Sequence, residues 1–239
     1  MISQGVDVKV MGGLGSQVLM YAYAMINWEG KLVETHYPNL NTGPTHRLMN
    51  PESTGKAHIE NILDIKFPLI PRSMCTNVTK SPNHVTNAMI NTVVLNRDYF
   101  LSLCSPKPAK SFDEVLLHFR GWDSRMLSEQ DVKKTVEKFK CSKIITDDVH
   151  FCKENFNIPV NEESQEQEWL RLTNSKTICY AAPSMFTLMA AYVNPYLQLN
   201  LISNTSATPA FGGRSHKVRY SKQANKFVQS LDNVNWVKI

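Results

Sequence analysis

The sequence predicts an α/β fold, in which helices cover both faces of parallel β-sheets. The first observation is that short runs of β-branched and apolar residues alternate with helical patterns through the second half of the chain. Such alternation is typical of sheets built from strand–helix–strand units. The second is that the chain opens in the same way, with an apolar strand pattern at 6–10, a glycine-rich turn and an apolar helical run at 18–26. The 239 residues, of which 42% are hydrophobic, can bury the core of one large or two small domains.

Prolines interrupt the first half between residues 38 and 84, so we expect loops there with one or two short helices. The best linker candidate is the Ser-Pro-Lys-Pro segment at 105–108, because two prolines favour an extended chain. We therefore predict two domains, at residues 1–105 and 106–239. The elements expected in the first domain are strands at 6–10, 31–35 and 89–95 and a helix at 18–26.

The second half alternates more regularly, and ligands of such sheets bind at the carboxyl ends of the strands. The expected strands lie at 114–119, 143–146, 177–180, 199–202 and 236–239. The expected helices lie at 129–139, 148–156, 162–172, 184–192 and 220–231.

Composition and charge exclude several classes of protein. A formal net charge of +5 suits an anionic small ligand and does not require a nucleic acid. No run approaches the roughly 18–20 apolar residues of a membrane span. The five cysteines lack zinc-site spacing and the first residues lack a secretory signal pattern, so we expect a cytoplasmic protein with reduced thiols. A late basic run is either a solvated face or a peripheral contact for an anionic acceptor or a membrane; it comprises Arg214, His216, Lys217, Arg219, Lys222 and Lys226.

The glycine-rich segment between the first strand and the first helix is the leading candidate for a ligand-binding turn. Gly12, Gly13 and Gly15 precede Ser16 and Gln17, and a turn without side chains lets a ligand approach the backbone N–H groups. The segment lacks the third glycine of a dinucleotide fingerprint and the Gly-Lys-Ser/Thr ending of a P-loop. A simple strand-to-helix turn remains the alternative.

A second candidate follows the strand at 114–119. In the segment His118-x-Arg120-x-x-Asp123, the arginine should emerge at the carboxyl edge of the sheet. Its guanidinium can hold a phosphate through two parallel hydrogen bonds, and Asp123 can orient it. The alternative is a structural Arg–Asp pair that closes a loop.

Two further candidates follow the next strands. Asp147 and Asp148 come directly after the strand at 143–146, where they cap the next helix, bind a ribose or base, or hold a divalent metal. Ser184 precedes an apolar helical run that contains Phe186 and Thr187. This run is either a buried helix with a serine cap or a phosphate site at a helix N-terminus.

Taken in order, these segments resemble the α-1,2-fucosyltransferase family, glycosyltransferase family 11. That family carries a G-G-L-G-N-Q loop, similar to 12–17 here, and an H-x-R-R-x-D motif, similar to 118–123. Its S-D-D segment resembles 146–148 and its S-T-F-S-W-W-A-A-Y-L-N run resembles 184–194. Ser16 stands where the family has asparagine, and Gly121 stands where it has a second arginine.

The resemblance implies a GT-B-like fold, with two Rossmann-like halves, parallel sheets and a cleft between them. It implies an inverting, metal-independent transfer of fucose from GDP-fucose to a hydroxyl of a glycan acceptor, without a further cofactor. The first half would bind the acceptor and the second the nucleotide sugar. Arg120 and Asp123 are the catalytic candidates. The donor-binding candidates are Gly13, Gly15, Ser16, Gln17, His118, Arg120, Asp147, Asp148, Ser184, Phe186 and Thr187.

Three alternatives stay open on these residues. The departures at Ser16 and Gly121 fit a catalytically impaired module of the same fold that binds nucleotide or glycan. Asp147 and Asp148 fit a metal-dependent enzyme. The base that an inverting transfer needs is not identified by the pattern; the candidates are Asp123, Glu129, His36 and His118.

Overall fold

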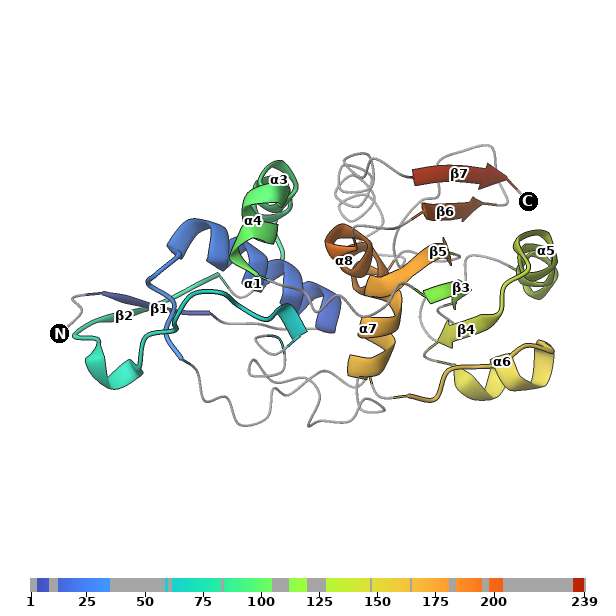
Figure 1. Cartoon of the computed structure of the whole chain (residues 1–239), viewed down its shortest axis with the longest axis horizontal. Coiled ribbons are helices and arrows are strands. Elements are labelled where there is room, and N and C mark those ends of the chain that lie inside the picture. The colour runs from blue at the N-terminus through green and yellow to red at the C-terminus, as the bar shows by residue number, and fades with distance from the viewer. Residues whose placement is uncertain are drawn as a thin grey trace. The chain divides into compact units, whose positions relative to one another are not determined.

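The chain divides into two compact units, Met1–Pro108 and Ala109–Ile239, and each is described here by itself. The computed structural model (Figure 1) describes residues 4–8, 13–34, 59, 62–82, 84–104, 112–119, 128–146, 148–163, 165–180, 184–194, 198–203 and 234–238. The helix expected at 220–231 and the linker at 105–108 lie outside these residues. None of the described helices is long and apolar enough to cross a membrane.

Unit 1 is built on a small parallel sheet. Strand β1 (Gly5–Asp7) pairs in parallel with β2 (Val78–Lys80), and single parallel bridges join Val6 to Leu32 and Val33 to Ile70. The segments therefore lie side by side in the order third, second, first and fourth along the chain. This is the order at the start of a dinucleotide-binding sheet, whose ligands bind where the strand order reverses. In unit 1 that point lies between β1 and β2.

The close packing of this sheet depends on Gly5. A Cβ at this position would lie 2.4 Å from Cγ2 of Val33 and 2.6 Å from Sγ of Cys75. Both distances are shorter than any real contact, so a glycine is required where β1 meets its neighbours. The strand expected at 31–35 is reduced to the two bridge residues Leu32 and Val33. Strand β2 and the 3-10 helix η3 (Arg72–Met74) lie in the proline-rich region, where we expected loops and short helices.

Helix α1 (Leu14–Trp28) is the central helix of unit 1. It is apolar on nearly every side, and most of its residues are buried. Helices α3 (Asn87–Leu95) and α4 (Arg97–Leu103) pack against it. The strand predicted at 89–95 is therefore wrong. Thr86 caps α3 by accepting a hydrogen bond from the Met89 N–H at 3.2 Å, and Met89, Ile90 and Val93 are buried at helical spacing.

Unit 2 contains a five-stranded sheet in which every pair of neighbours is parallel. The strands lie in the order β4-β3-β5-β6-β7, so the first strand of the unit lies between the second and the third. This is the other common doubly wound order, and its ligands bind between the first and third strands, here β3 and β5. The strands are β3 (Phe112–Phe119), β4 (Lys143–Thr146), β5 (Ser175–Tyr180), β6 (Gln198–Ser203) and β7 (Val234–Lys238).

Helices cover both faces of this sheet (Figure 1). One face carries α5 (Glu129–Phe139) and α6 (Val149–Asn155), and the other carries α7 (Gln165–Asn174) and α8 (Met185–Val193). The sequence predicted each of these helices. Beyond β4, the 159–161 segment pairs with the strand: Ile144 donates its N–H to Pro159 and accepts one from Asn161. The predicted α/β fold with parallel sheets is confirmed.

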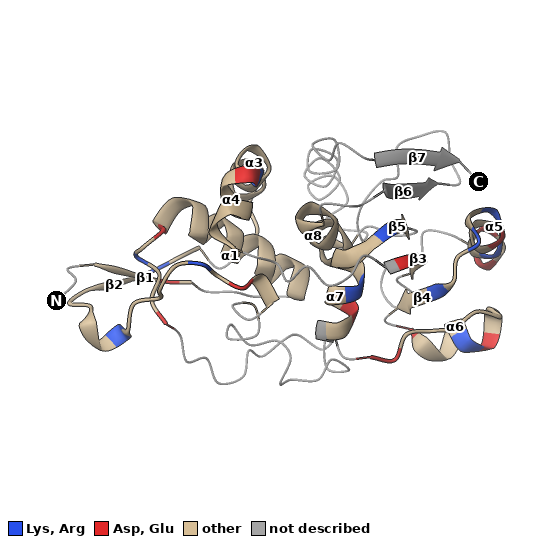
Figure 2. Ribbon diagram, in the orientation of Figure 1, with Lys and Arg blue, Asp and Glu red and all other residues tan. Residues whose placement is uncertain are grey.

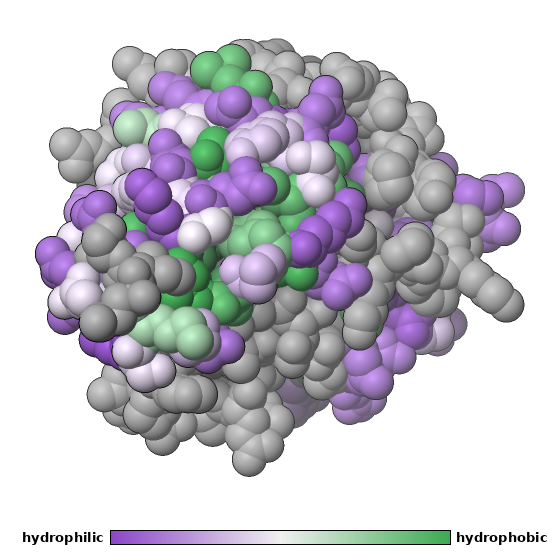
Figure 3. Space-filling model, turned by 60° about the vertical axis from the view of Figure 1, so that its left-hand side comes forward, coloured by the Kyte–Doolittle hydropathy of each residue, from purple (hydrophilic) through white to green (hydrophobic). Residues whose placement is uncertain are grey.

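Charge is distributed unevenly among the helices (Figure 2). Helix α5 carries both acidic and basic residues, whereas α1 and α8 carry none. Large apolar side chains are also exposed, and Figure 3 shows apolar patches among polar residues on one face. Among the described residues the exposed large hydrophobic side chains are Met74, Leu95 and Tyr99. All five cysteines are free thiols.

Candidate functional site

The carboxyl ends of β3, β4 and β5 meet at one edge of the unit 2 sheet. In the register of the ladders, Phe119 lies opposite Thr146, and His118 lies opposite Tyr180. Helix α8 begins four residues after β5, with Ser184 as its N-cap. The predicted residues His118, Asp148, Ser184, Phe186 and Thr187 therefore belong to the same edge, at the place where doubly wound sheets bind ligands.

The start of α8 is suited to an anion. Ser184 is buried and its Oγ accepts a hydrogen bond from the Phe186 N–H at 3.2 Å. The first turn contains no acidic residue, so no carboxylate of the helix neutralises the positive end of its dipole. Helix N-termini of this kind bind phosphate through backbone N–H groups.

His118 faces the α8 side of the sheet. Its neighbours Leu117 and Phe119 belong to the core cluster formed with α5 and α6, and successive side chains of a strand point to opposite faces. The His118 side chain is buried, and its ring centroid lies 6.3 Å from that of Phe186. The end of β3 and the first turn of α8 are thus in direct contact.

Asp148 caps a helix, as one of our alternatives expected. Its Oδ1 accepts a hydrogen bond from the Phe151 N–H at 3.3 Å at the start of α6. Its own N–H donates to Oγ1 of Thr146 at 3.0 Å. The geometry accounts for Asp148 as a structural residue, and a role in donor binding remains a prediction.

Thr187, in the first turn of α8, is fully buried. Among the described residues its hydroxyl has no hydrogen-bond partner, which is costly for a buried polar group. Thr187 is therefore the residue of α8 whose polarity local packing explains least. Phe186, one position earlier, is only partly buried.

The glycine-rich segment of unit 1 differs from the loop that we expected. Helix α1 starts at Leu14, directly after the N-cap Gly13, so Gly15, Ser16 and Gln17 form its first turn. The Gln17 N–H donates to the Gly13 carbonyl at 3.1 Å, and Gly15 and Gln17 are buried. The N-cap Gly13 has no side chain that could cap α1, and no acidic residue lies in the first turn of the helix. The glycines at 13 and 15, which we predicted to form a ligand-binding turn, therefore lie at the N-terminus of a helix, as Ser184 does in unit 2.

The sequence analysis did not select two residues that the structure makes notable, Asp7 and Trp169. Asp7 ends β1 with only 3% of its surface exposed; its Oδ2 lies 3.7 Å from Nη1 of Arg72, and its carbonyl accepts the Ser81 N–H at 2.9 Å. A single carboxylate in an apolar strand was the available signal. Trp169 of α7 packs against Phe186 with ring centroids 5.6 Å apart. No pattern in the sequence around either residue predicts this contact.

Several predicted residues lie outside the described part of the chain, namely Arg120, Asp123 and Asp147. Within the described part, no three or more His, Cys, Asp and Glu side chains gather as metal ligands do.

Comparison with known proteins adds little to this geometry. No family model matches the chain, and no curated protein matches its sequence. Among solved structures, the chain is similar to two crystal structures of POFUT1 in complex with GDP. The TM-score is 0.38 for both, at 11% and 10% identity, over 81% of this chain and 97% and 96% of those chains. A likeness of this size assigns neither a family nor an activity to the protein.

Proposed function

We propose that this protein is an inverting glycosyltransferase that moves fucose from GDP-fucose to a hydroxyl of a glycan acceptor. The proposal extends the resemblance to α-1,2-fucosyltransferases. It assigns the acceptor to residues 1–105 and the donor to residues 106–239. One observation carries it: the uncharged N-terminus of α8 lies at the strand-order reversal of unit 2, in ring contact with His118.

In this proposal the diphosphate of the donor binds at the first turn of α8. Backbone N–H groups and the helix dipole favour an anion there. Arg120 directly follows Phe119, the last residue of β3, and in this proposal its guanidinium binds the same diphosphate. The buried His118 and the partly buried Phe186 lie beside this position with their rings in contact.

The transfer itself is a displacement at the anomeric carbon. The acceptor oxygen forms the new glycosidic bond as the bond to GDP breaks, and the acceptor proton passes to a base. Negative charge develops on the leaving diphosphate, where Arg120 and the α8 N-terminus stabilise it. Removing one such electrostatic partner typically costs about 10²–10³ in rate. The proposal includes no metal and no cofactor.

The base candidates are Asp123, Glu129, His36 and His118. Glu129 pairs with Lys133 on the next turn of α5, which gives its carboxylate a local role. We assign the proton to Asp123, which follows Arg120 by three residues.

Turnover with GDP-fucose and a panel of glycan acceptors tests this proposal. The wild-type protein should release GDP and yield a fucosylated product with or without EDTA. Arg120→Ala should lower the rate by at least about 100-fold, whereas the control Arg97→Ala, on α4 of unit 1, should not. Equal rates in wild type and Arg120→Ala would contradict the assigned role of Arg120. Nucleotide or glycan binding without turnover would instead identify the binding module, and loss of activity in EDTA would identify a metal-dependent enzyme.

A further inference from the structure

We infer that Trp169 is a positioning residue, which holds the first turn of α8 in place for nucleotide binding. The inference rests on the proposed function and extends it to a residue that touches neither GDP nor the acceptor. It concerns three aromatic side chains from three elements: Trp169 of α7, Phe186 of α8 and His118 of β3.

The Phe186 ring is in contact with each of the other two rings. Its centroid lies 5.6 Å from that of Trp169 and 6.3 Å from that of His118. The interplanar angles are 54° and 50°, so both pairs are tilted. Centroid distances of this size are those of favourable aromatic pairs. The Phe186 ring therefore packs against two buried rings, which limits its freedom.

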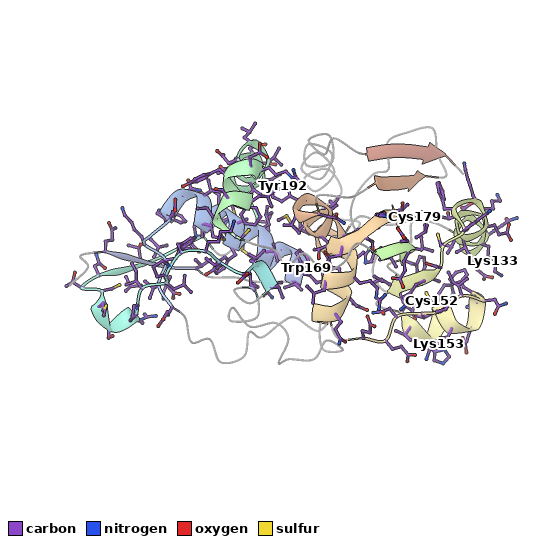
Figure 4. The ribbon with its side chains drawn as sticks, in the orientation of Figure 1. Lys133, Cys152, Lys153, Trp169, Cys179 and Tyr192 are labelled. Carbon is purple, nitrogen blue, oxygen red and sulfur yellow. The ribbon has the colours of Figure 1, made fainter. Side chains whose placement is uncertain are left out.

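Phe186 is also part of the helix N-terminus. Its N–H donates to Oγ of Ser184, so the side chain and the cap belong to the same turn. A shift of the ring would move the backbone N–H groups that are proposed to bind the diphosphate. Trp169, which is labelled on α7 in Figure 4, has only 1% of its surface exposed and packs against that ring.

Trp169 can act as a fixed support because α7 is anchored at its other end. The Asn194 side chain, directly after α8, donates to the carbonyls of Leu172 at 3.0 Å and Ser175 at 2.8 Å. Arg171 joins α7 to β3 through Glu114 at 2.7 Å. The far end of α8 is thus tied to the end of α7 by hydrogen bonds, and its first turn is held by the ring of Trp169.

Calorimetry with GDP tests this inference in the full-length protein. Trp169→Leu should weaken GDP binding about tenfold, and Trp169→Phe, which keeps a ring, should restore most of the affinity. Leu172→Ala is the matched control, because Leu172 is equally buried on the same helix and has no ring to contact Phe186. This control should lower the melting temperature by a similar amount and leave the affinity for GDP unchanged.

Fluorescence supplies a readout that a purely structural role would not move. Addition of GDP should change the tryptophan emission of the wild type. The change should be clearly smaller in Trp169→Phe than in Trp28→Phe, which alters unit 1. Wild-type affinity in Trp169→Leu, or equal weakening in Leu172→Ala, would overturn the inference. No binding of GDP to the wild type would contradict the proposed function and remove the inference with it.

Discussion

The rings of His118 and Phe186 lie with their centroids 6.3 Å apart, so the end of β3 touches the start of α8. The two residues come from different strand–helix units and meet because β3 and β5 are neighbours in the sheet. This neighbour relationship places a buried imidazole beside an uncharged helix N-terminus. The proposed nucleotide site depends on that pairing.

The cap of α8 should contribute to both stability and binding. Ser184→Ala removes the acceptor of the Phe186 N–H, so we expect a loss of about 1 kcal/mol in the free energy of unfolding. The first turn should also fray, which should weaken GDP binding about threefold to tenfold. Urea denaturation and calorimetry measure the two effects. Thr86→Ala removes the equivalent cap of α3, and it should cost the same stability without changing the affinity for GDP. Equal effects of both variants on GDP binding would contradict a site at α8.

Acid should destabilise unit 2 in part through Glu163. The hydrogen bond from Arg171 holds the pKa of the Glu163 carboxyl below its usual value. Because the native pKa is the lower one, this pair stabilises the fold above the unfolded pKa of about 4.3 and loses its effect as the pH falls below that. Glu163→Gln should therefore flatten the fall in stability between roughly pH 5 and pH 3. Urea denaturation over this range is the measurement, and an unchanged pH profile would show that the pair does not contribute.

Arg171 itself should matter more than an ordinary surface cation. It is only 15% exposed and donates to Glu163 at 2.7 and 3.1 Å and to Glu114 at 2.7 Å. Arg171→Met leaves two half-buried carboxylates without their partner, so we expect a loss of about 1–3 kcal/mol in denaturation experiments. The control is Lys133→Met, which breaks an exposed pair on α5 and should cost at most about 0.5 kcal/mol. Similar losses for both variants would contradict this ranking.

The end of α5 offers a stabilising change. Lys140 follows the helix with φ of 52°, a left-handed conformation that glycine adopts without strain. Lys140→Gly should raise the free energy of unfolding by about 1 kcal/mol. Lys138→Gly, inside the last turn, should lower it by about the same amount. Thermal melting distinguishes the two, and a destabilised Lys140→Gly would show that the lysine side chain stabilises the fold.

Gly5 should tolerate no side chain. The Cβ of Gly5→Ala would overlap Val33 and Cys75, so we expect a loss of about 1–3 kcal/mol in the free energy of unfolding. Adding Val33→Ala removes the closer of the two atoms and should restore part of the loss relative to Val33→Ala alone. Denaturation of the three variants is the check. Purely additive effects would contradict the contact.

Much of unit 2 could be predicted because its signals are local. Helix α5 begins after a Ser128 cap that accepts from the Asp131 N–H, and β4 consists largely of β-branched residues. Both elements have the bounds that the sequence predicts. In contrast, the pattern of the 89–95 segment, which contains Val93 and Val94, suits a strand as well as a helix. The cap at Thr86 and the packing of this segment against α1 stabilise the helical conformation.

The candidate site could be predicted only in part. His118 and Ser184 could be predicted because His118 lies near the end of an apolar strand pattern and Ser184 directly precedes an apolar helical run. The residues that support them, Trp169 and Arg171, could not be predicted, because their contacts join segments that are distant in the sequence. In the sequence, Trp169 is an ordinary candidate for the core. Its contact with Phe186 is seen only in the structure, where α7 packs against α8. Arg171 meets Glu114 across 57 positions of sequence, and no periodicity encodes such a pair.

A crystal structure of the protein with GDP tests the central claim most directly. The account predicts the diphosphate at the first turn of α8, bound by backbone N–H groups after Ser184 and by the guanidinium of Arg120. GDP bound away from this turn, or Arg120 directed away from the phosphates, would contradict it.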